Sequence, residues 1–262
     1  MTSADSTVEL KRLGLGLVLA LATATGELHA QGAAPCSAPP ALTQSGFELP
    51  RLARSLREGP PSVVLVLNSS SAAGKVGDGK AADVVRRFPS YLEEALRARY
   101  PAHPINVVTR SEPKLDAVDM VERLPELLTA VKPALVIWQA GTYDAIRGVE
   151  LDAFADAVGT GIDLAHQAGA DMLLMSPQFS PRTDFAFDAA PYASMLLWAA
   201  RSNGAPVFDR YALMRFWDEE GLFDFDSLRA EPGLFENVHR CVGRLLVNMI
   251  ADGVTLRTVG SR

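Results

Sequence analysis

Short apolar runs alternate with longer amphipathic segments along most of this chain, and this alternation restricts its fold more than any other feature. The short runs predict buried strands at residues 63–67, 105–109, 134–140, 171–176 and 205–208. Apolar residues at helical spacing predict helices over 81–100, 116–131, 151–168, 187–203, 211–217 and 238–251. Strands that alternate with helices in this way imply a parallel sheet covered by helices on both faces.

Length and charge narrow the classes of protein further. The 262 residues suffice for one sizeable α/β domain. We divide the chain into a leader (residues 1–30), a linker with a short helix (residues 31–60) and an α/β domain (residues 61–262). The formal net charge is −6 and no run is rich in Lys and Arg, so we expect no nucleic-acid partner.

The first 30 residues have the pattern of a cleaved export signal. Lys11 and Arg12 form a basic region, residues 13–24 form an apolar region, and residues 28–30 supply a cleavage site after Ala30. The apolar region is too short to span a bilayer comfortably, which makes an uncleaved anchor the lesser alternative. We therefore expect a periplasmic or secreted protein with no stable membrane span after cleavage.

Cysteines and clustered carboxylates are the other features that carry possible chemistry. Cys36 and Cys241 are the only cysteines, and in an oxidising compartment they could pair or remain two thiols. A disulfide here would add about 4–5 kcal/mol by restricting the unfolded chain. The two cysteines are too far apart for a zinc motif. Before the last helix lie Asp224, Asp226, Glu231 and Glu236, which we interpret as solvated rather than as metal ligands. No metal or cofactor is expected.

The first predicted strand ends in Asn68-Ser69-Ser70-Ser71, followed by Ala72-Ala73-Gly74. Ligands of parallel α/β sheets bind beyond the carboxyl ends of the strands. These hydroxyls therefore lie where a nucleophile would be placed. The alternative interpretation is an ordinary polar loop between a strand and a helix.

Three features together resemble the SGNH, or GDSL-like, hydrolase family: two sequence blocks, and the final helix, which in the family follows an Asp-x-x-His motif. The loop at residues 68–74 is similar to the family's Gly-Asp-Ser-x-x-x-Gly motif, which places the nucleophile on Ser70. Residues 132–144 are similar to the strand that ends in the family's Gly-x-Asn-Asp motif. The resemblance runs from about residue 63 to the end. It implies a three-layer α/β/α sandwich with a parallel five-stranded sheet of flavodoxin-like topology, and carboxylic-ester (O-acyl) hydrolysis. The pocket residues it implies, including the oxyanion site, are Ser71, Gly141, Tyr143 and Asp144.

The chain departs from this family at positions that the family uses for chemistry. Asn68 and Ser69 replace the Gly and Asp of the first motif, and Tyr143 replaces the oxyanion asparagine. Residues 109–114, where the family has a glycine whose N–H joins the oxyanion hole, contain no glycine, and Pro113 has no N–H to donate. The predicted strand cores remain apolar.

The base that would activate Ser70 is open between two alignments. A serine hydroxyl needs a base, and histidine suits that role near neutral pH. One alignment places Glu236-x-x-His239 on the family's Asp-x-x-His, with His239 as base and Glu236 as its orienting group. The other alignment places Phe235 at the histidine position, and both the acid and the base are then lost.

Two functions follow from these alternatives. The first is an ester hydrolase acting on O-acyl groups of glycans or lipids, with Ser70 as nucleophile. The second is a catalytically silent relative that binds a glycan, a lipid or a protein partner in the same pocket. The oligomeric state is not indicated by the sequence.

Overall fold

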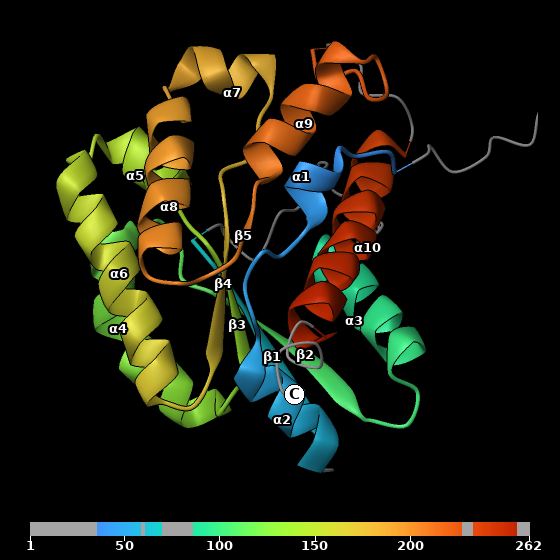
Figure 1. Ribbon diagram of the computed structural model, residues 1–262. Coiled ribbons are helices and arrows are strands. Elements are labelled where there is room, and N and C mark those ends of the chain that lie inside the picture. Colours follow the sequence, from blue (N-terminus) through green and yellow to red (C-terminus); the bar gives the residue numbers. More distant parts are fainter. Residues whose placement is uncertain (1–35, 59–60, 70–85, 227–232, 256–262) are drawn as a thin grey trace, which may run out of the picture. The chain divides into compact units, whose positions relative to one another are not determined.

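The computed structural model describes residues 36–58, 61–69, 86–226 and 233–255. Its strands form one parallel sheet in the order β2-β1-β3-β4-β5 (Figure 1). This order is the flavodoxin-like one, with its switch point between β1 and β3. The strands are β1 (Ser62–Asn68), β2 (Ile105–Ser111), β3 (Leu135–Gln139), β4 (Asp171–Met175) and β5 (Val207–Phe208). The predicted sandwich and its five-stranded parallel sheet are confirmed.

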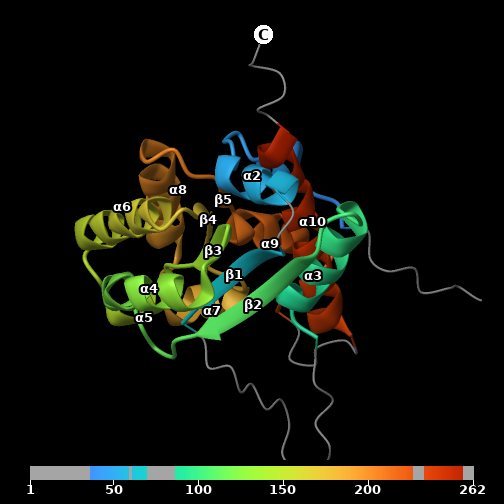
Figure 2. The same cartoon turned by 90° about the horizontal axis from the view of Figure 1, so that it is seen from below.

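Helices cover both faces of the sheet (Figure 2). One face carries α4 (Ala117–Val131), α6 (Leu151–Gln167) and α8 (Ala190–Ser202). The opposite face carries α2 (Pro50–Glu58), α3 (Phe88–Arg99), α9 (Arg210–Glu219) and α10 (Leu234–Thr255). Three shorter helices, α1 (Pro40–Thr43), α5 (Thr142–Arg147) and α7 (Pro181–Ala186), lie in the connections.

The central strand β1 shows why its sequence is apolar without interruption. Val64 and Val66 pack into the core under α3 and α10, whereas Leu65 and Leu67 pack into the core under α4 and α6. All of these side chains are fully buried. A strand buried on both faces needs apolar residues at every position, which is typical of parallel sheets covered on both sides.

Residues 36–58 belong to the domain and are not a linker, contrary to the division made from the sequence. Leu49, Leu52 and Leu56 are buried in the core beneath α10. The carboxylate of Asp171 in β4 accepts hydrogen bonds from the backbone N–H groups of Arg51 and Leu52, both at 2.9 Å. The start of α2 is therefore held by a strand of the central sheet.

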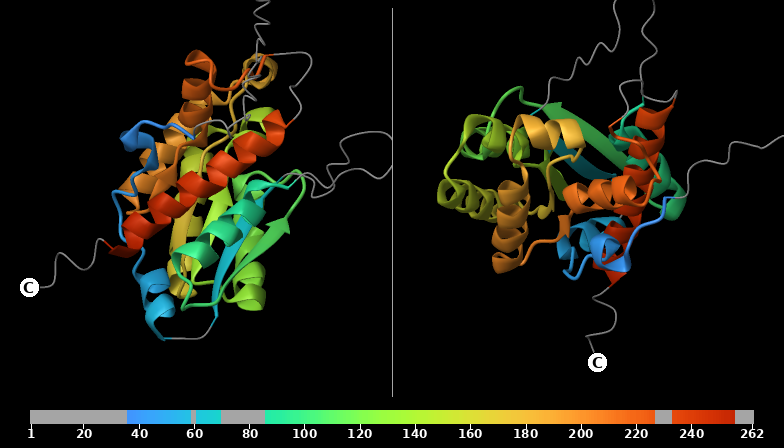
Figure 3. Two further views of the ribbon diagram at one scale, coloured as in Figure 1. Left: turned by 90° about the vertical axis from the view of Figure 1, so that its right-hand side faces the viewer. Right: turned by 90° about the horizontal axis from the view of Figure 1, so that it is seen from above.

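Helix boundaries differ from the sequence prediction, and the largest differences are in α3 and α10. Helix α3 begins at Phe88 with Pro89 in its first turn, a position that proline favours because the missing N–H would have no helical partner there. Helix α10 begins at Leu234, before the expected residue 238. It lies alongside α3, as the left view of Figure 3 shows.

The leader at residues 1–30 lies outside the described residues. Across the described ranges, none of the helices has both the length and the apolar character needed to cross a membrane.

Candidate functional site

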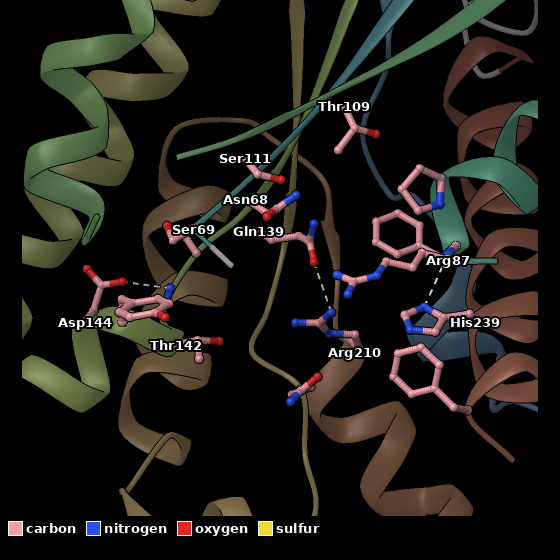
Figure 4. Close-up of a pocket in the computed structure, with 17 residues that line it drawn as sticks. Asn68, Ser69, Arg87, Thr109, Ser111, Gln139, Thr142, Asp144, Arg210 and His239 are labelled. Atoms are coloured by element: carbon pink, nitrogen blue, oxygen red, sulfur yellow. Dashed lines mark hydrogen bonds between the residues drawn. The ribbon is translucent and has the colours of Figure 1, made fainter. Parts of the chain in front are cut away.

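A pocket of about 420 Å³ opens at the carboxyl ends of β1, β2 and β3 (Figure 4). This is the switch point of the sheet, where neighbouring strands connect to helices on opposite faces and leave a crevice. Side chains from both halves of the chain line it. They include Asn68, Ser69, Arg87, Thr109, Ser111, Gln139, Thr142, Tyr143, Gln178, Arg210, Phe235 and His239.

The expected nucleophile Ser70 and its neighbour Ser71 lie outside the described residues, so their positions are not part of the geometry below. Ser69, the residue before them, lines the pocket. The carbonyl of Ser69 accepts a hydrogen bond from the Lys114 N–H at 2.9 Å, and the carbonyl of Asn68 accepts one from the Glu112 N–H at 2.9 Å. Asn68 and Ser69 are thus fixed on the segment that follows β2, up to the residue that precedes Ser70.

Asp144 has a structural role at the edge of the pocket. Its side chain is buried, and its two carboxylate oxygens accept hydrogen bonds from the N–H groups of Ala117 at 2.7 Å and Gly141 at 2.9 Å. Burial raises the pKa of Asp144, while these hydrogen bonds act in the opposite direction. The carboxylate joins the start of α4 to the turn after β3, and Tyr143 beside it lines the pocket.

Gly141 forms the tight turn between β3 and α5. Its φ of 96° lies in the left-handed region, and a Cβ at this position would come within 2.9 Å of Cγ of Pro177. A larger residue here would therefore disturb the turn itself. Gly141 therefore shapes the pocket through its backbone.

His239 lies in the pocket and is bonded to the end of a helix. Its Nδ1 accepts a hydrogen bond of 3.2 Å from the backbone N–H of Phe88, the first residue of α3 (Figure 4). The first N–H groups of a helix have no partner within the helix. The imidazole of His239 supplies that partner from α10, 151 residues further along the chain.

This hydrogen bond determines which nitrogen of His239 carries the proton. A backbone N–H can only donate, so Nδ1 must be unprotonated and the neutral ring must carry its proton on Nε2. In a serine hydrolase the opposite arrangement is required: Nδ1–H donates to a carboxylate, and Nε2 accepts the serine proton. The tautomer that the Phe88 hydrogen bond requires has no free lone pair on the imidazole to receive that proton.

The surroundings of His239 also keep it neutral. Its pKa is lowered from 6.5 to about 4, first by burial and then by the charges of Arg210 and Arg87. The start of α3 acts in the same direction, because the positive end of a helix dipole disfavours a nearby cation. His239 is therefore a neutral hydrogen-bond acceptor at neutral pH.

Glu236, the expected orienting group, points to other partners. Its Oε1 accepts a hydrogen bond from the hydroxyl of Tyr91 at 2.5 Å and one from Arg240 at 3.4 Å. Within the described ranges it makes no hydrogen bond to His239. Tyr91 and Arg240 account for the lowered pKa of Glu236. The Phe88 N–H, rather than the Glu236 carboxylate, occupies Nδ1 of His239.

Phe235 and His239, the two candidates for the family's histidine position, are in contact. Their rings lie edge to face with centroids 4.2 Å apart, and both line the pocket. The structure therefore brings the aromatic residue of one alignment and the histidine of the other to the same wall.

The sequence prediction missed two arginines that line the pocket, Arg87 and Arg210. Arg210 begins α9 directly after β5, and its Nη1 donates to Oε1 of Gln139 at 3.1 Å. The rule that directed attention to Ser70, a polar residue just after a buried strand, also points to Arg210. Arg87 precedes α3 and carries no comparable signal.

The described members of the acidic cluster named above, Asp224, Asp226 and Glu236, do not form a metal site. Glu231 lies outside the described residues, and Glu236 is bonded to Tyr91 and Arg240. In the part of the chain that the structure describes, no group of three His, Cys, Asp or Glu side chains is placed to hold a metal ion.

The cysteines at the two ends of the domain are joined. Cys36 and Cys241 form a disulfide with an S–S distance of 2.04 Å and a Cα–Cα distance of 5.0 Å. Cys241 is two residues beyond the pocket residue His239 on α10, so the disulfide ties the segment before α1 to the helix that carries the site.

Comparison with known protein families assigns the chain to one of them. The model of the non-GDSL lipase-like family matches residues 35–256. The chain belongs to this family. The match starts before α1 and ends just after α10, so it covers the whole domain described above. The resemblance of this non-GDSL lipase-like protein to SGNH hydrolases is confirmed.

Solved structures of low sequence identity share the fold. Axe2, an acetylxylan esterase from Geobacillus stearothermophilus, matches as a catalytic mutant with a TM-score of 0.51 and 17% identity, covering 78% of this chain and 96% of that one. LAE5, an alpha/beta hydrolase enzyme from the metagenome of Lake Arreo, Spain, gives a TM-score of 0.53 at 16% identity, covering 71% and 97%. A lipase/acylhydrolase from Enterococcus faecalis gives 0.50 at 17% identity, covering 71% and 94%. No curated protein matches the chain significantly by sequence.

Proposed function

We propose that this non-GDSL lipase-like protein uses the hydrolase fold to bind a ligand in the pocket and does not hydrolyse esters through Ser70. The observation that supports this most strongly is the hydrogen bond from the Phe88 N–H to Nδ1 of His239. It holds the imidazole in the tautomer that cannot accept a proton at Nε2. The catalytically silent alternative is thus the function that the pocket supports best.

Two further observations favour a silent site. Glu236 is engaged by Tyr91 and Arg240, so it is not available to stabilise an imidazolium at His239. The lowered pKa of His239 means that an imidazolium, which would have to form during serine attack, is disfavoured in this surrounding. Each effect alone would slow the reaction, and together they remove both functions of a catalytic histidine.

The second candidate is an active O-acyl hydrolase that acts on a glycan or a lipid. It is favoured by the position of Ser69 and His239 in one pocket and by the structural similarity to an acetylxylan esterase and a lipase/acylhydrolase. For this activity His239 would have to release the Phe88 N–H and reverse its tautomer. Ser70 would then act as nucleophile, with its N–H and Tyr143 at the oxyanion.

Labelling with a fluorophosphonate distinguishes the two functions. We expect the folded, purified protein to show no covalent adduct by intact and peptide mass spectrometry, and no turnover of short acyl esters above the Ser70→Ala variant. An adduct at Ser70 that is lost in His239→Ala would contradict the silent assignment. An active SGNH esterase labelled in parallel serves as the positive control for the reagent.

We also propose that the protein is exported, with the leader removed after Ala30. The Cys36–Cys241 disulfide supports this proposal, because disulfides persist in oxidising compartments. We expect the protein recovered from a periplasmic or secreted fraction to begin at Gln31 in an N-terminal sequence determination. A full-length chain that stays inside the cell with free thiols would contradict this.

A further inference from the structure

A second cavity of about 220 Å³ adjoins the pocket and differs from it in chemistry. The two share a wall that includes Arg210, Phe235 and His239. The rest of the second cavity is lined largely by apolar side chains, namely Phe179, Met214, Phe225, Leu234, Val238 and Val242. A ligand that occupied both would have a polar end at the strand termini and an apolar end against α9 and α10.

Arg210 lies at the junction of the two cavities, and none of the described carboxylates forms a salt bridge with it. Its guanidinium is bonded to the neutral amide oxygen of Gln139, and its buried Nε has no hydrogen-bond partner among the described residues. Burial lowers the pKa of Arg210 to about 10, so it remains charged at neutral pH. A buried cation without an anion is costly, and natural proteins rarely keep one.

Arg87 adds a second positive charge to the same pocket. Figure 4 shows Arg87 and Arg210 extending into it from the residue before α3 and from the start of α9. Both charges act on His239, whose pKa they lower. Asp144 is the one carboxylate among the described residues that line the two cavities, and backbone N–H groups at α4 and α5 occupy it.

We propose that the two cavities bind an amphiphilic anion, whose carboxylate or phosphate head lies between Arg210 and Arg87 and whose short apolar chain lies against Met214 and Leu234. Guanidinium groups match carboxylate and phosphate oxygens in pairs, and Nε with one Nη forms the usual fork. This inference rests on the proposed function, since the ligand is bound and released without covalent change.

Titration calorimetry with octanoate, octyl phosphate and octanol tests whether the ligand needs an anionic head group, and whether that group is a carboxylate or a phosphate. We expect at least one of the two anions to bind. Octanol should bind at least about tenfold more weakly than that anion, because it lacks the negative charge that would pair with Arg210. Acetate and inorganic phosphate carry the head without the chain, and should bind more weakly than their octyl counterparts. The anion that binds more tightly identifies the head group.

Substitutions then assign each end of the ligand. Arg210→Gln and Arg87→Gln should each weaken the octyl anion by about tenfold or more. Arg215→Gln is the matched control, because Arg215 is an exposed arginine of the same helix α9 that pairs with Glu219 outside both cavities. Leu234→Trp should weaken the octyl anions and leave the binding of the short anions unchanged.

The inference is overturned if neither octyl anion binds the folded wild-type protein, or if binding is the same in Arg210→Gln and Arg87→Gln as in Arg215→Gln. Circular dichroism and an unfolding curve establish that each variant is folded, and Arg87→Gln carries the test if Arg210→Gln does not fold. Ester turnover by the wild-type protein would overturn the proposed function alone. Absence of anion binding in a protein without turnover would overturn this inference alone.

Discussion

His239 shows how one hydrogen bond can change the chemistry of a residue without changing its identity. The same imidazole that would be a base in a serine hydrolase is here an acceptor at the start of α3. Its lone pair on Nδ1 satisfies a helix N–H that would otherwise lack a partner. The consequence is a histidine with a structural task and a proton on the nitrogen that a base would need free.

The lowered pKa of His239 predicts how stability depends on pH. The unfolded chain binds a proton at this residue below about pH 6.5, whereas the folded protein does so only near pH 4. Stability should therefore fall by about 2–3 kcal/mol as the pH drops from 6.5 to 4, and this contribution should be constant above pH 7.

Urea unfolding at a series of pH values measures this effect. His239→Asn should lose this part of the pH dependence, because asparagine does not titrate but can still accept the Phe88 N–H. His103→Asn, at a histidine outside the pocket, is the control and should keep it. An unchanged slope in His239→Asn would show that another group causes the pH dependence.

Asp144 gives a second prediction for a single side chain. Asp144→Asn replaces one accepting oxygen by an NH₂ group that faces a backbone N–H, either that of Ala117 or that of Gly141. We expect a loss of about 2–4 kcal/mol in the free energy of unfolding, measured with urea. Asp163→Asn, at an exposed aspartate on α6, should change it by less than about 0.5 kcal/mol. Equal effects would contradict the structural role of Asp144.

At the scale of elements, the site depends on how closely α10 approaches α3. Gly243 of α10 faces α3 so closely that a Cβ would lie 2.8 Å from Cβ of Tyr91 and 3.0 Å from the Leu92 nitrogen. This contact lies one turn beyond His239 and places its ring against the start of α3. The two helices also join through the Glu236–Tyr91 hydrogen bond.

Gly243→Ala should destabilise the protein by about 1–3 kcal/mol, because backbone atoms of α3 cannot move aside easily. Alanine is otherwise the better helix former, so a loss of stability in Gly243→Ala would report the close packing and not helix propensity. Gly159→Ala in α6 is the matched control, since its Cβ would meet only the side chain of Asn203, at 3.3 Å. Thermal unfolding of both variants measures the two changes in stability. A stabilised Gly243→Ala would contradict the close packing.

The sequence was sufficient to predict the sheet but not the partners in the site. Uninterrupted apolar runs such as β1 are a local signal, and the alternation with helices then fixes a parallel arrangement. Glu236, expected before the last helix, and His239 lie three residues apart on α10. Whether Glu236 and His239 bond to each other depends on the competing partners that α3 supplies. These partners, the Tyr91 hydroxyl and the Phe88 N–H, come from a segment far away in the chain.

For the molecule as a whole, the disulfide closes the domain. Cys36 and Cys241 are 205 residues apart, and the bond fixes the segment before α1 to α10, the helix that carries His239. The sequence allowed this pair, but the alternative of two thiols could be decided only by placing both ends of the domain together. Residues 36–58, which the sequence analysis assigned to a linker with a short helix, likewise contribute leucines to the core.

Removing the disulfide should lower the free energy of unfolding by about 4–5 kcal/mol, because the unfolded chain regains a very long loop. The measurement is guanidinium unfolding of the Cys36→Ser/Cys241→Ser double variant, compared with the wild type with and without reductant. The reduced wild type should match the variant. Equal stability of the oxidised and reduced wild type would contradict a role for the disulfide in holding the domain closed.

The central claim is that His239 is held in a tautomer that cannot serve as a base, and long-range ¹H–¹⁵N NMR correlation of the histidine rings tests it most directly. The ¹⁵N shifts separate a protonated from an unprotonated ring nitrogen, and His239→Asn assigns the signals. At neutral pH we predict a neutral ring with the proton on Nε2 and an unprotonated Nδ1. A proton on Nδ1 with a free Nε2, or a charged imidazolium, would contradict the account and restore His239 as a candidate base for Ser70.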